Sequence, residues 1–87
     1  MKGMNSIIGI LHDVHYLRIE TEIFKDIKKG DKQLKAKIND NYKVGDTLIL
    51  EELNLKGIYS GDWTPKEITD IDLKEDNVSL SLKDIVI

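Results

Sequence analysis

The sequence contains no cysteine among its 87 residues. This absence excludes disulfide bonds, thiolate catalysis and thiolate metal sites, so the core must be held together by packing alone. Long apolar runs are also missing, because the run at residues 7–11 is far shorter than the roughly 20 residues of a membrane-spanning helix. The start of the chain has a single lysine, Lys2, and no small-residue cleavage site, unlike a signal peptide. We therefore expect a soluble, cytoplasmic protein without membrane contact.

Several motifs of catalysis and cofactor binding are absent as well. The chain has no glycine-rich phosphate loop, no Walker motif and no catalytic Ser-His pair. His12 and His15 suggest a metal site, but residues three apart on a strand point to opposite faces, so the two imidazoles would not converge. The sequence therefore predicts neither a metal ion nor another cofactor.

The charge of the chain is unevenly distributed. Residues 25–43 contain seven lysines and three aspartates, a local charge of +4, whereas the formal net charge of the whole chain is −3. An acidic chain is a poor general binder of nucleic acid, but a local basic segment can hold a short single strand or one phosphate. The alternative is a lysine-covered solvent face that keeps the protein soluble.

Alternation of apolar and polar residues predicts several strands. Within them, Leu17 and Ile19 are expected to face the core, and Lys35 and Lys37 to face outward. Pro65 is expected near the start of its strand, where no ladder N–H is required. The predicted strands cover residues 6–11, 14–20, 33–38, 47–55, 64–73 and 78–87.

One short helix is predicted over residues 21–29. Thr21 is a suitable N-cap and Gly30 a suitable residue after the C-terminus, while Phe24 and Ile27 form an apolar face. Connections of hairpin length favour a sheet that closes on itself. Residues 1–87 are therefore predicted to form one domain with a mostly β (α+β) fold, a small antiparallel β-barrel of five or six strands with one short helix.

Short motifs in a fixed order cover most of the chain. They are His15-x-Leu17-Arg18-Ile19, Phe24 with Ile27, Gly30-x-Lys32 followed by Asn39-Asp40, Val44-Gly45-Asp46, and Tyr59-Ser60-Gly61. This series resembles the small ASCH domains of the PUA-like superfamily, and within them a branch of prokaryotic and phage proteins without assigned function. The resemblance implies a PUA/ASCH-like β-barrel with a cleft for RNA or a nucleotide.

Two positions depart from the ASCH pattern. Lys35 replaces a glutamate and Lys37 an arginine, so the cleft would present point charges instead of a planar guanidinium fork. Some ASCH relatives are amidohydrolases of acylated nucleosides that use a lysine, a threonine nucleophile and a glutamate. Lys32 matches that lysine, but Lys35 stands where the threonine would be. Without a nucleophile the reaction cannot start, so we expect no enzymatic activity.

The leading hypothesis is a non-catalytic module that binds RNA or a nucleotide in a lysine-lined cleft. Tyr42, Tyr59 and Trp63 could stack on bases; Tyr59 is preferred because glycines flank it, and Trp63 is expected to cover the core. The alternative is a protein-interaction module, for example a phage-type inhibitor of a host or defence protein that uses its acidic surface. The predicted binding residues are Lys32, Lys35, Lys37, His15, Tyr59 and Asn39.

Overall fold

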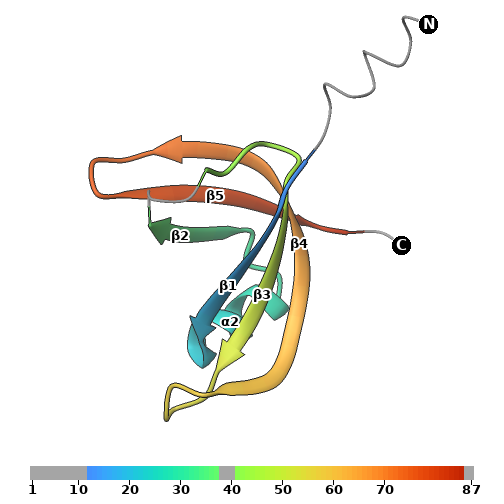
Figure 1. The fold of residues 1–87 in the computed structure, drawn as a ribbon, viewed down its shortest axis with the longest axis vertical. Coiled ribbons are helices and arrows are strands. Elements are labelled where there is room, and N and C mark those ends of the chain that lie inside the picture. The colour runs from blue at the N-terminus through green and yellow to red at the C-terminus, as the bar shows by residue number, and fades with distance from the viewer. Residues whose placement is uncertain (1–11, 38–40, 86–87) are drawn as a thin grey trace, which may run out of the picture.

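The computed structural model describes residues 12–37 and 41–85. These residues form five strands and one helix. The strands make up a single sheet of order β1-β3-β4-β5-β2 (Figure 1). The predicted mostly-β fold with one short helix is confirmed, while the predicted strand at 6–11 lies outside the described residues. The elements are β1 (Val14–Glu20), α2 (Thr21–Lys28), β2 (Gln33–Lys37), β3 (Thr47–Leu53), β4 (Tyr59–Leu73) and β5 (Asn77–Asp84).

The sheet is mixed and strongly curved. Three neighbouring pairs are antiparallel, but β1 runs parallel to β3 because α2, β2 and the following turn carry the chain back to the same end. The 15-residue β4 pairs with β3 along its first part and with β5 along its second, and a bulge separates Ile68 from Asp70. Bulges increase local bending and twist. The sheet therefore forms a half-barrel with β1 and β2 as its two edges (Figure 1).

Helix α2 closes one end of the core. Phe24 and Ile27 are 4% and 1% exposed, which confirms the predicted docking face. The predicted N-cap, Thr21, is wrong. Glu20 holds the N-cap position and makes no capping hydrogen bond with its side chain, while the Thr21 hydroxyl donates to Glu52 on β3. The buried apolar core consists of Ile19, Phe24, Ile27, Leu34, Leu48, Leu50, Ile68, Val78, Leu80 and Leu82.

The start of β4 differs from the sequence-based prediction. The strand begins at Tyr59, so Pro65 lies in its interior instead of near its start. Pairing with β5 begins only at Lys66, so the missing N–H of Pro65 interrupts no ladder on that side. Trp63 is 53% exposed and does not cover the core, because it lies beside Glu51 on the outer face of the sheet.

Strand β2 follows its predicted alternation. Leu34 is buried and Ala36 half-buried, whereas Lys35 and Lys37 are exposed. Each lysine lies opposite a polar residue of β5, Ser79 and Asn77 respectively. No helix in the described part of the chain is long and apolar enough to cross a membrane.

Candidate functional site

A buried carboxylate joins the start of β1 to the turn before β3. Asp46 has no exposed surface. Of the charged residues in the described ranges 12–37 and 41–85, it is the one that is buried. Its Oδ1 accepts a hydrogen bond from the Asp13 amide at 3.0 Å, and its Oδ2 accepts one from the Lys43 amide at 3.0 Å. The same Oδ2 lies 2.8 Å from His15 Nε2. We call Asp13, His15, Lys43 and Asp46 the junction cluster.

The surroundings of the junction cluster hold it in one arrangement. Lys43 Nζ lies 2.6 Å from Asp13 Oδ2 and 3.8 Å from Asp46 Oδ2. Gly45 has a φ of +96°, and a Cβ placed there would lie 2.5 Å from His12 Nε2, so the turn requires glycine. The Val44-Gly45-Asp46 motif forms a turn, and the Asp46 carboxylate caps it by accepting the hydrogen bond from the Lys43 amide.

Hydrogen bonding keeps the junction cluster charged. Burial would raise the pKa of Asp46, but the hydrogen bond with His15 and those from the Asp13 and Lys43 amides outweigh it and lower that pKa. The hydrogen bond to Asp13 raises the pKa of Lys43, although burial opposes this effect. At neutral pH Asp46 is therefore a carboxylate and Lys43 an ammonium.

The junction cluster has the donor types of a metal site. Ligand atoms of Asp13, His15 and Asp46 all lie within 4.8 Å of one another. Carboxylate and imidazole groups are common ligands of divalent metals. Here, however, the Lys43 ammonium already lies against both carboxylates, and His15 and two amides occupy the Asp46 oxygens. The cluster is thus satisfied internally, and it positions the imidazole of His15.

A groove of about 320 Å³ lies between the two edge strands of the half-barrel. Leu17, Ile19 and Ala36 belong to or pack against the core and form its apolar part. Within the described chain, the Lys35 and Lys37 ammonium groups have no ion-pair partner. The lining residues are Leu17, Arg18 and Ile19 of β1, Lys35, Ala36 and Lys37 of β2, and Tyr42. We call this the edge groove; it carries cationic side chains and no carboxylate.

The junction cluster adjoins the edge groove through Tyr42. The rings of His15 and Tyr42 are 4.8 Å apart between centroids and tilted by 56°. Tyr42 is partly buried against the core and also lines the groove. The structure thus brings three of the predicted residues, His15, Lys35 and Lys37, to the same region.

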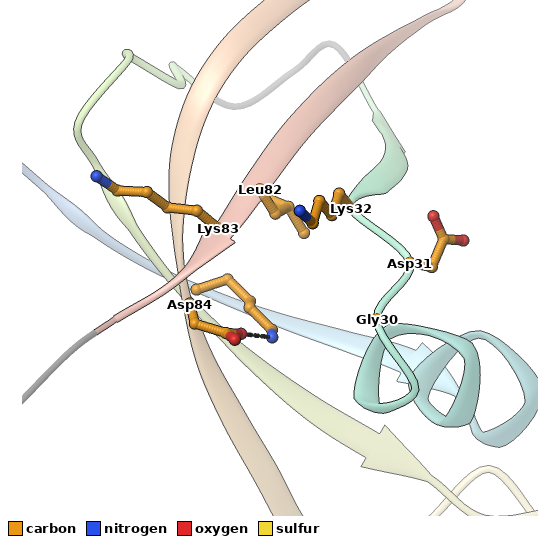
Figure 2. Close-up of a pocket in the computed structure, with 7 residues that line it drawn as sticks. Gly30, Asp31, Lys32, Leu82, Lys83 and Asp84 are labelled. Carbon is orange, nitrogen blue, oxygen red and sulfur yellow. Dashed lines mark hydrogen bonds and ion pairs between the residues drawn. The ribbon is translucent and has the colours of Figure 1, made fainter.

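Lys32 lies in another place. It lines a pocket of about 130 Å³ between the end of α2 and the end of β5 (Figure 2). Figure 2 shows Asp31 directed away from Lys32, and its dashed line marks the ion pair of Asp84 with Lys66, whose side chain is drawn without a label. The hydrogen bond from Lys66 lowers the pKa of Asp84. The other lining residues are Gly30, Leu82 and Lys83.

Tyr59 and Asn39 are the remaining predicted residues. Tyr59 lines a hollow of about 280 Å³ with Tyr16, Ile49, Glu51 and Trp63, separate from the edge groove. Asn39 lies outside the described residues.

A protein-family model described as "Domain of unknown function (DUF3850)" matches residues 14–85. The chain belongs to the DUF3850 family. The match extends from the first residue of β1 to the residue after β5, so the DUF3850 domain includes the edge groove, nearly all of the junction cluster and the hollow beside Tyr59. No curated protein matches the chain.

Sequence reasoning missed two features of this DUF3850 domain. The local pattern around Asp46 indicates only a turn, although its partners Asp13 and His15 lie 33 and 31 residues away in the sequence. Tyr42 was ranked below Tyr59 as a stacking residue, although Tyr42 lines the groove that contains the lysines. The signal available in the sequence was an aspartate directly after a turn glycine and before an apolar strand.

Proposed function

We propose that the protein is a non-catalytic, cytoplasmic module that binds single-stranded RNA or a nucleotide in the edge groove. One observation carries the proposal: two exposed lysines without ion-pair partners in the described chain line a groove with an apolar floor and a tyrosine. Such a groove offers charge for phosphate and an aromatic surface for a base.

The arrangement of β2 supports this use of its lysines. Lys35 and Lys37 are two residues apart on a strand, so their side chains leave the same face. Their mutual repulsion is relieved when an anion binds between them. Tyr42, backed by the His15 ring, can stack on an unpaired base.

The resemblance to ASCH domains is in line with the same function. We further propose that the DUF3850 half-barrel is a variant of the PUA-like fold. In support, a helix follows the first strand and the Val44-Gly45-Asp46 turn precedes β3, in the order that the resemblance implies.

Binding of labelled oligoribonucleotides tests the proposal. Fluorescence anisotropy at low salt should show micromolar or weaker affinity for a short single strand, which falls as salt rises because few phosphates are contacted. The double variant Lys35→Glu/Lys37→Glu should abolish binding without unfolding, because both side chains are exposed. Tyr42→Leu should weaken binding by about 1–3 kcal/mol with little change in the salt dependence.

A matched control distinguishes the groove from general charge. Lys29 and Lys56 are exposed and do not line the groove, so Lys29→Glu/Lys56→Glu changes the net charge equally and should retain binding. If neither oligonucleotides nor mononucleotides bind, or if both double variants bind alike, the proposal fails. The protein-interaction alternative would then take its place.

A further inference from the structure

Three aromatic side chains surround a hollow on the outer face of the β1–β3–β4 part of the sheet. Tyr16, Tyr59 and Trp63 line it together with Ile49 and Glu51. The register explains the cluster: Tyr16 lies beside Ile49, and Glu51 lies beside Trp63. The hollow has a volume of about 280 Å³ and shares no lining residue with the edge groove.

Two of these three rings are highly exposed for aromatic residues. Tyr16 is 69% exposed and Trp63 is 53% exposed, so neither contributes mainly to the core. The chain has five aromatic residues of the Phe, Tyr and Trp types, and three of them meet at this hollow. Large aromatic surfaces are usually buried, so this concentration at the surface requires another explanation.

The charge at the hollow indicates which ligand it suits. Glu51 is the one charged residue among the lining residues, and its side chain is only 19% exposed. A shielded carboxylate beside aromatic faces attracts cations, because the ring faces are electron-rich. The same carboxylate would repel the phosphate of a nucleotide.

Arg18 already shows this recognition within the molecule. Its guanidinium carbon lies 5.7 Å from the centroid of the Tyr59 ring, and its Nε lies 3.4 Å from Glu51 Oε1. Arg18 therefore uses one ring and the carboxylate of the hollow, while Tyr16 and Trp63 carry no such cation contact in the described chain. Its own side chain is 61% exposed, so a competing cation can displace it at little cost.

We propose that this hollow binds an alkylated ammonium head group, as in choline or a trimethylated lysine side chain. The aromatic rings and Ile49 contact the methyl groups, and Glu51 balances the charge. A bare ammonium is strongly hydrated and gains less from such walls than an alkylated one. Binding requires Arg18 to move from Glu51, so Arg18 acts as an internal competitor.

The fluorescence of Trp63 reports on the site directly, because Trp63 is the sole tryptophan. Titration with choline chloride at constant ionic strength should give a saturable change. The neutral isostere 3,3-dimethylbutan-1-ol should bind at least about tenfold more weakly, because it has the same shape without the charge. A short peptide with trimethyllysine distinguishes a protein-borne ligand from a free one, and saturable binding of either supports the proposal.

Variants assign the binding to the residues named. Glu51→Gln should weaken choline binding about tenfold, whereas Glu67→Gln, on the same sheet and outside the hollow, should leave it unchanged. Arg18→Met should strengthen binding by removing the competitor. Calorimetry with Trp63→Leu, which needs no fluorescence signal, should show loss of binding.

The proposal has clear opposing outcomes. The proposal is overturned if neither choline nor the peptide shows saturable binding. It is also overturned if the neutral isostere binds as well as choline, or if the two glutamine variants have equal effects. Preferential binding of adenosine would also overturn it and would instead identify a stacking surface for bases. Lys35→Glu/Lys37→Glu should bind choline normally, so this test is independent of the edge groove.

Discussion

Asp46 is a charged residue at a position where charge is costly. A carboxylate without exposed surface is tolerated only when its oxygens are hydrogen-bonded and its charge is compensated. Two amides, the His15 ring and the Lys43 ammonium meet these conditions. Through them, one side chain ties the entry of β1 to the entry of β3, its parallel neighbour.

Removal of this carboxylate should destabilise the protein strongly. Asp46→Ala leaves the Asp13 and Lys43 amides and the His15 ring without their acceptor, and we expect a loss of about 3–5 kcal/mol in the free energy of unfolding. Urea denaturation followed by circular dichroism measures the change. Asp76→Ala, at an exposed turn position, should change it by less than about 0.5 kcal/mol. Equal effects of the two variants would contradict the role of Asp46.

The same carboxylate should make stability depend on acid pH. The folded pKa of Asp46 lies below its ordinary value of 3.8, so the unfolded chain binds the proton more readily. The ionised Asp46 therefore contributes fully to the free energy of unfolding well above pH 3.8, and this contribution is lost as the pH falls from there through the folded pKa. The difference in unfolding free energy between wild type and Asp46→Asn should therefore shrink as the pH falls below about 4. A difference that grows below this pH would refute this assignment.

At the scale of elements, alternation carries most of the information. It predicts β1, β2 and the inward faces of Ile19 and Leu34, because a half-buried strand must alternate. Alternation fails at the start of β4, because residues 59–63 do not alternate between apolar and polar types. In this part of the strand the pairing with β3 also shifts register, between Glu51 and Leu53. The parallel pairing of β1 with β3 is also absent from the pattern, because alternation states which face is buried but not which strand is the neighbour.

Helix α2 gives the clearest test at this scale. Phe24 is buried against the sheet, so Phe24→Ala should lower the free energy of unfolding by roughly 3–5 kcal/mol. Ile23 is the neighbouring apolar residue and is 41% exposed, so Ile23→Ala should cost less than about 1 kcal/mol. Thermal melting of both variants provides the comparison, and a wild-type melting temperature for Phe24→Ala would disprove the docking of α2.

At the scale of the whole molecule, curvature decides which residues meet. The half-barrel brings its two edge strands to opposite walls of one groove, so Lys35 and Lys37 of β2 come near Leu17 and Ile19 of β1. The sequence predicts that these lysines share a face, but not that the opposite edge of the sheet completes the groove. That information depends on the bulge in β4 and on the order of strands, which local patterns do not contain.

The same arrangement places Lys32 and Lys35 in different hollows of the molecule. Under the proposed resemblance to ASCH domains, Lys32 would correspond to the amidohydrolase lysine and lines the pocket near Asp84, whereas Lys35 would stand at the position of the nucleophile and lines the edge groove. A lysine ammonium at that position is not a nucleophile, and the amidohydrolase reaction requires one that is activated by a nearby base. We therefore expect acylated cytidines to remain intact during incubation with the protein, as measured by chromatography against a Lys32→Ala control. Turnover clearly above that control would contradict this prediction and would implicate Lys32 in the reaction.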